Sequence, residues 1–304
     1  MARPRPALSY VVRADEWGPV ADVATALAGQ TAATVELVVV SRTPFEVPAG
    51  AAAPPVTVVV EPEPESWESA LTLGVHTANA DVVALGETHV LLRPSWAASV
   101  LAAHHDGADV VLPTMVNANS ESALSEAAFV MDYGRYGGGC ASGVPVPVYN
   151  ASFRRSLLVE SPSLPRTLVP GPALDTFVRS QGAVVVSEPA AVVAHYNVDR
   201  PSAWVDERFI AGLLMARARR SGWTRRRTIL YAVAFPAIAG TLFRRTHQLL
   251  RSGSPRGSRV ALAFGCLLYA LGEACGYVGA PTPSAARRME RYETYKRRFV
   301  RAPA

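Results

Sequence analysis

Residues 81–89 read DVVALGETH, and this stretch predicts a buried strand that ends in polar residues. DVVAL is an apolar run typical of a buried strand, and Glu87, Thr88 and His89 follow it before any helix can begin. Ligands of α/β proteins bind where strands end. Alternate side chains of an extended segment point the same way. Glu87 and His89 are therefore predicted to converge, and a carboxylate beside an imidazole could hold a divalent metal.

The rest of the front half alternates strand-like and helix-like patterns. Short apolar runs typical of strands occupy residues 8–12, 35–41, 56–62 and 108–116. Helical spacing of apolar residues occupies residues 17–30, 66–79, 94–107 and 121–134. Further along, 144–158 is predicted to be extended and then helical, and 171–197 to form a helix and two strands. This alternation predicts an α/β fold with a mostly parallel sheet and crossover helices.

The bulk composition limits the class of protein. The chain has 304 residues, of which 49% are hydrophobic. Cys140, Cys266 and Cys275 show no paired spacing, which disfavours a disulfide framework or a zinc site and fits a reducing compartment. The first residues hold no long apolar stretch, so no signal peptide is expected.

Charge is divided unevenly along the chain. Residues 1–200 hold 11 Arg and Lys against 20 Asp and Glu, a net charge of −9. Residues 201–304 hold 19 against 5, a net charge of +14. A basic back half behind an acidic front half points to a polyanion or an anionic membrane surface as a partner.

The back half differs from the front in composition as well. We expect a first domain over residues 1–205 and a basic, membrane-associated helical region over 206–304, with apolar segments at 229–243 and 260–280. Only the second segment has the roughly 20 residues that span a bilayer. We favour segments that lie in the interface with arginines on anionic lipid. Two buried helices of a soluble domain are the alternative. A nucleic-acid partner is not expected, because long apolar runs beside the arginines suit lipid better.

Several motifs follow one another in a familiar order. Residues 74–89 read GVHTANADVVALGETH and are followed by Pro94-Ser-Trp96. NANSESAL (117–124), NASFRR (150–155) and GEACGY (272–277) come later. This order resembles the bacterial family 2 glycosyltransferases of the GT-A type, in a branch with E-x-H in place of the usual acidic metal motif. The GT-A fold is the Rossmann-like fold of nucleotide-diphospho-sugar transferases.

The resemblance implies an activity and a set of ligands. It implies a glycosyltransferase that moves a sugar from a nucleotide-diphosphate donor to a lipid-linked or polysaccharide acceptor at the cytoplasmic face of the membrane. Glu87 and His89 would hold a divalent metal, Mn²⁺ or Mg²⁺, that neutralises the leaving diphosphate. His195, which ends a strand in VVAHYN, would lie near the metal or diphosphate. The structural alternatives are a Glu–His pair that caps a loop and a half-buried histidine.

The remaining site residues are expected where the sequence departs from the family pattern. The second strand of the family ends in acidic residues that contact the nucleotide, whereas this one ends in Ser41 and Arg42, so Asp15 and Ser41 are the predicted donor contacts. The family's catalytic acidic pair falls on residues 170–171, Pro-Gly. Inverting transfer needs a carboxylate to take the acceptor's proton. Asp175 is the predicted base, and Asp199 and Asp206 are the alternative candidates. The second hypothesis is a GT-A-like, membrane-bound partner in glycan assembly that does not catalyse.

Overall fold

The structure is a computed structural model of the whole chain and divides into two compact units. The first unit comprises residues 1–116 and 136–194, and the second comprises residues 117–135 and 195–304. Each unit is described by itself. The described residues are 5–31, 33–64, 66–138, 143–169, 171–220, 222–279 and 283–301. Pro170 of the expected acidic-pair position lies outside them.

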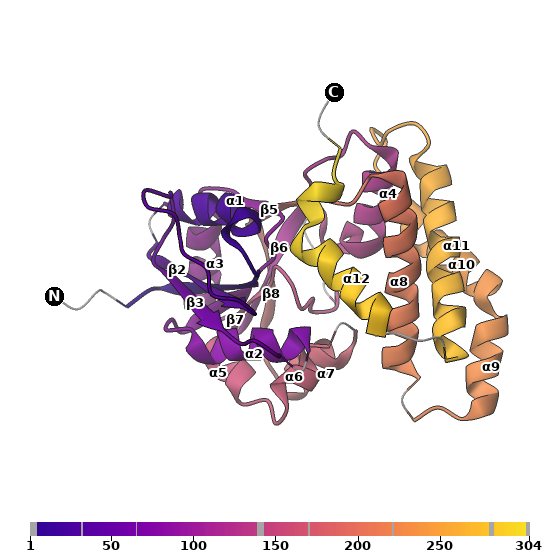
Figure 1. Cartoon of the computed structure of the whole chain (residues 1–304), viewed down its shortest axis with the longest axis horizontal. Coiled ribbons are helices and arrows are strands. Elements are labelled where there is room, and N and C mark those ends of the chain that lie inside the picture. The colour runs from indigo at the N-terminus through magenta and orange to yellow at the C-terminus, as the bar shows by residue number, and fades with distance from the viewer. Residues whose placement is uncertain are drawn as a thin grey trace. The chain divides into compact units, whose positions relative to one another are not determined.

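The first unit is an α/β fold built on a mixed sheet of eight strands (Figure 1). The strand order is β3-β2-β1-β4-β7-β6-β8-β5. The strands are β1 (Leu8–Arg13), β2 (Val35–Ser41), β3 (Val56–Val60), β4 (Val82–Leu85), β5 (Val90–Leu92), β6 (Val110–Asn117), β7 (Ser152–Arg154) and β8 (Val185–His195). The half made of β3, β2, β1 and β4 is parallel, as predicted, whereas β7 runs antiparallel to both β4 and β6.

Helices connect the parallel strands and cover the sheet. They are α1 (Trp17–Ala28), α2 (Trp67–Thr77), α3 (Trp96–His105), α5 (Arg155–Val159), α6 (Leu164–Thr167) and α7 (Ala173–Ser180). Leucines and valines of α2, α5, α6 and α7 share one core with the inward side chains of β1, β2, β4 and β6. In Figure 1 these four helices lie together below the sheet. The core forms because the central strands are fully buried and mostly apolar, and burial of apolar side chains is the main stabilising term.

Close approach of α2 to the sheet depends on one glycine of the motif at 74–89. A Cβ on Gly74 would lie 2.3 Å from Cγ1 of Val11 on β1, so only glycine lets the helix pack at this depth. Ser66 caps the first turn of α2 by accepting the Ser69 N–H. The start of α2 and its depth against the sheet are therefore fixed, and a short connection leads from the helix into β4, after which Glu87 follows.

Residues 171–197 form α7 and a single strand, β8, rather than the predicted helix and two strands. Pro189 lies inside this strand, where a proline normally interrupts pairing. The chain is exposed at Pro189 and Ala190, and the Glu188 side chain accepts the Ala190 N–H at 2.8 Å. A hydrogen bond to the Glu188 side chain thus takes the place of a hydrogen bond between strands, and the strand continues to His195.

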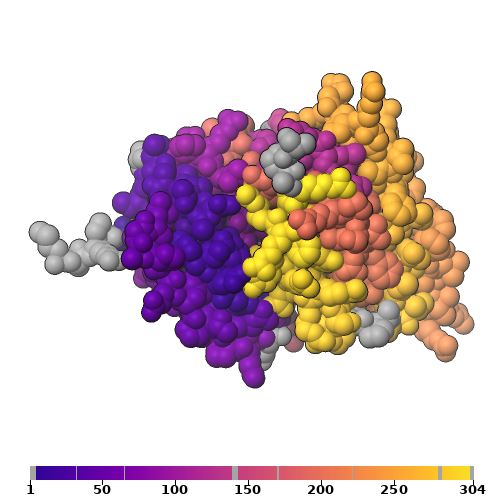
Figure 2. Space-filling view, turned by 45° about the horizontal axis from the view of Figure 1, so that its top comes forward, coloured from indigo at the N-terminus to yellow at the C-terminus, as the bar shows by residue number. Residues whose placement is uncertain are grey.

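The second unit is helical. Its helices are α4 (Ala123–Asp132), α8 (Pro201–Arg219), α9 (Arg225–Val233), α10 (Phe235–Thr246), α11 (Ser258–Tyr277) and α12 (Pro283–Thr294), with short 3₁₀ turns at Gly134–Tyr136, His247–Leu249 and Lys296–Phe299. Figure 2 shows the yellow residues of α12 against the salmon residues of α8. The predicted apolar segment 229–243 is divided between α9 and α10, and the segment 260–280 corresponds to α11.

Glycines bring α8 and α11 into backbone contact. A Cβ on Gly212 would lie 1.9 Å from the carbonyl oxygen of Tyr269, and a Cβ on Gly272 would lie 2.0 Å from that of Phe209. Within the described part of the chain, α11 is the only helix long and apolar enough to cross a membrane, and 44% of its apolar window is buried. A core helix has the same length and composition.

Replacing Gly212 by alanine is expected to lower the free energy of unfolding by about 2–3 kcal/mol, because the new methyl meets main chain that cannot move aside. The matched control is Gly240→Ala on α10, where a Cβ meets nothing within 4 Å. That substitution should raise stability by up to about 1 kcal/mol through helix propensity. Urea denaturation of both variants checks the prediction, and equal stability of the two would contradict it.

Candidate metal centre

Glu87 and His89 lie where the chain leaves β4 and turns into β5. Gly86 makes the turn possible, because a Cβ there would lie 2.0 Å from ring atoms of Tyr10. The Gly86 N–H continues the pairing by donating to the Val11 carbonyl at 2.8 Å. Glu87 and His89 are both buried, at 6% and 2% exposure, so their polar atoms are held in fixed positions. Burial likewise raises the pKa of Tyr10, which stays a neutral phenol beside Glu87.

The Glu87 carboxylate is oriented by Asn150. Asn150 donates from Nδ2 to Glu87 Oε2 at 2.6 Å, and its main-chain N–H donates to the Leu85 carbonyl at 2.6 Å. Asn150 has a φ of 66°, a left-handed conformation that asparagine tolerates better than most residues. The other oxygen, Oε1, lies 3.6 Å from His89 Nε2, which is longer than a hydrogen bond. This separation leaves room for both atoms to be ligands of one ion.

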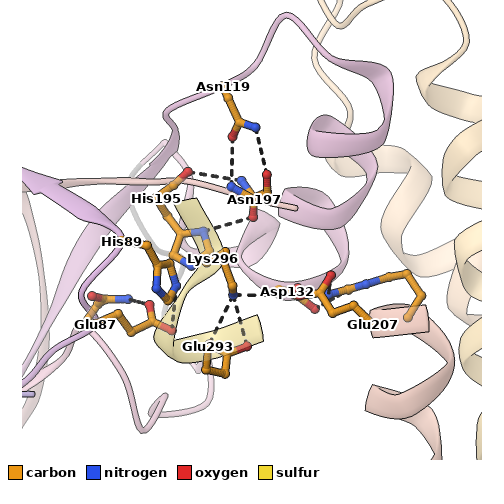
Figure 3. A network of polar contacts seen from close by, with 11 residues as sticks. Glu87, His89, Asn119, Asp132, His195, Asn197, Glu207, Glu293 and Lys296 are labelled. Atoms are coloured by element: carbon orange, nitrogen blue, oxygen red, sulfur yellow. Dashed lines mark hydrogen bonds and ion pairs between the residues drawn. The ribbon is translucent and has the colours of Figure 1, made fainter. Parts of the chain in front are cut away.

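His195, the last residue of β8, completes a cluster of possible ligands. One ligand atom from each of Glu87, His89 and His195 lies within 4.8 Å of the others (Figure 3). His195 is 1% exposed, and its ring packs on Tyr133 with ring centroids 4.5 Å apart. Its carbonyl accepts the Ala118 N–H at 2.9 Å. The structure therefore brings the two predicted metal ligands together with the histidine predicted to lie near the metal.

The donor chemistry of this cluster fits a divalent transition metal. A carboxylate and two imidazoles are a common ligand set for such ions, whereas Mg²⁺ prefers oxygen ligands and keeps several waters. The three residues would hold the ion at the carboxyl edge of β4. Such an ion would supply positive charge that can stabilise an anion bound beside it. The set therefore favours Mn²⁺ of the two predicted ions.

We expect Mn²⁺ and Co²⁺ to bind more tightly than Mg²⁺, because two of the three ligands are imidazole nitrogens. Calorimetric titration of each ion, alone and in competition, measures this preference. Replacing His89 by alanine should shrink the preference, since it removes one nitrogen ligand. Equal affinity for Mg²⁺ and Mn²⁺ in the unaltered protein would show that the imidazoles do not bind the ion.

The predicted donor contacts lie at the ends of the neighbouring parallel strands. Asp15 follows β1 and accepts hydrogen bonds from the Arg42 main-chain N–H and from its Nε, both at 2.9 Å. Burial opposes ionisation of Asp15, but the hydrogen bonds and charge of Arg42 outweigh it and hold the pKa of this carboxyl below its usual value. Ser41 Oγ donates to the Thr43 carbonyl at 2.6 Å. β1, β2 and β4 are parallel, so Asp15, Ser41 and Glu87 lie at the same edge of the sheet.

Asp175 has a structural role in the fold. It lies in the first turn of α7, where its carboxylate accepts the Val146 N–H at 3.0 Å and both oxygens accept from Arg179 Nε at 3.0 Å. These bonds tie the segment before β7 to α7. The alternatives are also engaged: Asp199 accepts the Arg301 N–H at 2.7 Å, and Asp206 pairs with Arg288 at 2.9 Å.

Comparison with known proteins gives structural similarity at low sequence identity. No protein-family model matches the chain, and no curated protein matches it. The mannosyltransferase PcManGT from Pyrobaculum calidifontis, in complex with GDP-Man and Mn²⁺, is 15% identical, over 95% of this chain and 79% of that one, with a TM-score of 0.47. S. aureus TarS 1–349 in complex with UDP-GlcNAc is 13% identical, over 90% of this chain and 92% of that one, with a TM-score of 0.46. A mycobacterial protein is 16% identical, over 70% and 72%, with a TM-score of 0.45.

Proposed function

We propose that the chain is a metal-dependent glycosyltransferase that takes a sugar from a nucleotide-diphosphate donor. The observation that carries this proposal is the buried cluster of Glu87, His89 and His195 at the carboxyl edge of a parallel half-sheet. Open α/β sheets bind their ligands at this edge. A metal there would face the diphosphate, and the ends of β1 and β2 would face the nucleoside.

The donor is held, in this proposal, by groups on three neighbouring strands. Asp15 and Ser41 would contact the nucleoside, while Glu87, His89 and His195 would hold the metal on the diphosphate. Arg13 ends β1 and stacks on Trp67 with its guanidinium carbon 4.5 Å from the ring centroid. An arginine fixed by stacking loses little freedom when it binds an anion, so Arg13 suits a phosphate contact.

The experiment that tests the function is calorimetric binding of UDP and GDP with and without Mn²⁺. Binding of either nucleotide that requires the metal would support the proposal. A folded protein that binds neither nucleotide under either condition would contradict it for these two donor nucleotides.

A second candidate is a GT-A-like partner in glycan assembly that binds the donor without catalysing transfer. The engagement of Asp175 favours this candidate, because a carboxylate that accepts the Val146 N–H and the Arg179 guanidinium is poorly placed to take a proton. If Asp175 is the base, Asp175→Asn should abolish transfer and leave nucleotide affinity unchanged. Metal-dependent binding of a nucleotide-sugar with neither transfer nor hydrolysis would favour the second candidate.

The proposed acceptor is lipid-linked or a polysaccharide, at the cytoplasmic face of the membrane. In the second unit, α9 and α11 pack together and expose large apolar side chains. On α11, Val260, Phe264, Leu267 and Leu271 recur at helical spacing along one face. On α9, Leu230 and Val233 are 65% and 72% exposed. An exposed apolar face in a region of net charge +14 fits an anionic membrane surface.

The arginines at the start of α9 are expected to add to membrane binding. Replacing Arg225 and Arg226 by alanine should weaken binding to vesicles that contain anionic lipid by about 2 kcal/mol, roughly 30-fold, because each surface arginine contributes about 1 kcal/mol. Both side chains are exposed, so the fold should not change. The control is Arg166→Ala, an exposed arginine of the first unit. Co-sedimentation with anionic and zwitterionic vesicles measures the effect, and equal binding by both variants would refute the proposed contact.

A further inference from the structure

Two amide side chains of the second unit, one half-buried and one buried, lead from Glu126 on α4 to the imidazole of His195. Asn117 Nδ2 donates to Glu126 Oε2 at 2.9 Å, and Asn197 Nδ2 donates to Asn117 Oδ1 at 2.9 Å. Asn197 Oδ1 lies 3.0 Å from His195 Nδ1. Figure 3 shows the two side chains facing each other. Glu126, Asn197 and His195 are all buried, so water does not replace these partners.

The orientation of each amide in this chain follows from its partners. The Asn119 main-chain N–H, which can only donate, lies 3.2 Å from Asn117 Oδ1, and this places the Asn117 nitrogen toward the Glu126 carboxylate. The Asn197 nitrogen meets two acceptors, Asn117 Oδ1 and the His195 carbonyl oxygen at 3.2 Å. The oxygen of Asn197 must therefore face the imidazole. In the reversed amide, Asn197 Oδ1 would lie against two other acceptors, Asn117 Oδ1 and the His195 carbonyl oxygen.

An amide oxygen cannot donate, so His195 Nδ1 must carry the proton in this hydrogen bond. A neutral imidazole has one N–H, which leaves Nε2 with its lone pair. We propose that Asn197 is a positioning residue that fixes the Nδ1–H tautomer of His195 and so assigns Nε2 as the nitrogen that binds the metal beside Glu87 and His89. The assignment of Nε2 as a metal ligand rests on the proposed function. The assignment of the Nδ1–H tautomer does not depend on it.

Asn119 supports the same loop in a different way and provides a matched control. Its Oδ1 accepts the Asn197 N–H at 2.9 Å, and its Nδ2 donates to the Asn197 carbonyl at 2.8 Å. These bonds hold the main chain of Asn197, while the bond to the imidazole comes from its side chain. Loss of either asparagine removes hydrogen bonds that are at least partly buried, but only loss of Asn197 removes the acceptor of His195 Nδ1.

The first test reads the tautomer directly in the full chain without metal. The protein has six histidines, so ¹⁵N-histidine labelling gives few imidazole signals, and His195→Gln identifies the signal of His195. At alkaline pH, where imidazoles are neutral, two-bond ¹H–¹⁵N correlation spectra distinguish the two tautomers. We expect the Nδ1–H form for His195. An Nε2–H form, or a mixture of both, would overturn the proposal whether or not the chain binds a metal.

The second test measures Mn²⁺ affinity in Asn197→Leu, which keeps the branched shape of the side chain and removes the acceptor. Residues that orient a metal ligand typically contribute 10- to 100-fold to metal affinity, so a loss in that range is expected. Asn119→Ala should lose less than about threefold in Mn²⁺ affinity, and melting curves report whether each variant folds.

A folded Asn197→Leu that binds Mn²⁺ as tightly as the unaltered protein would overturn the positioning role. If Asn197→Leu does not fold, the tautomer of His195 in the unaltered protein tests the proposal instead. If the unaltered protein binds no Mn²⁺, the metal part of the assignment fails, and the tautomer spectrum still tests what Asn197 does to His195.

Discussion

Glu87→Ala is expected to lower the affinity for a nucleotide in the presence of Mn²⁺ by about 100-fold or more, because it removes the only carboxylate of the described ligand cluster. Two imidazoles alone leave the ion with more positive charge and fewer ligands. Glu87→Gln should lose nearly as much, since a neutral amide oxygen is a weaker ligand than a carboxylate. Calorimetric titration of UDP and GDP with each variant gives the affinities.

The control for this prediction is Glu160→Ala, an exposed carboxylate of the same unit. It changes the net charge by the same amount and should leave nucleotide affinity unchanged. Thermal melts are needed as well, because Glu87→Ala also removes the acceptor of Asn150 Nδ2. A folded Glu87→Ala that retains metal-dependent binding would contradict the assignment of Glu87.

Arg208→Met is expected to lower the free energy of unfolding by about 3–5 kcal/mol, because it breaks a buried ion-pair network from one side. Arg208 is 3% exposed and pairs with Asp132 at 2.8 Å and with Glu207 at 3.1 Å. Its loss leaves the Glu207 carboxylate buried with less compensation. Chemical denaturation measures the change. Arg288→Met is the control, because Arg288 is half-exposed in its pair with Asp206 and should contribute less than about 1 kcal/mol.

The loss caused by Arg208→Met should depend on pH. Burial raises the pKa of Glu207, although Arg208 and Lys296 oppose the shift. A carboxyl with a raised pKa in the folded state contributes stability below its unfolded pKa and loses it as pH rises through the folded pKa. Without Arg208 the shift should grow, so the variant should be closest to the unaltered protein near about pH 5 and furthest from it near about pH 8. A loss no larger than that of Arg288→Met at either pH would contradict the account.

The parallel half of the fold could be predicted from sequence because its signal is local. β1, β2 and β4 are buried along their whole length and therefore appear in the sequence as short, mostly apolar runs. β5 could not be found, because three residues carry no usable periodicity. The division of 229–243 into two helices has a local signal, since Pro236 lies in the first turn of α10 and suits a helix start. An apolar segment with an internal proline can also form a kinked helix, so the sequence did not decide between them.

The candidate site was accessible from sequence only in part. Glu87 and His89 are close in the chain and follow one strand, so their convergence follows from strand geometry. The approach of His195 depends on the position of β8 in the sheet, which no local pattern encodes. Asn150 and Asn117 were visible only as members of motifs without a role. Asn197 gave no signal at all, because its role depends on a network formed in the folded chain.

The proposed donor site is best tested by a crystal structure with Mn²⁺ and UDP or GDP, with diffraction data collected to reveal the anomalous scattering of manganese. We expect a manganese peak bounded by Glu87, His89 and His195, with the diphosphate against it and the nucleoside toward Asp15 and Ser41. A manganese peak at other carboxylates, or a nucleotide bound away from the carboxyl ends of β1, β2 and β4, would contradict it.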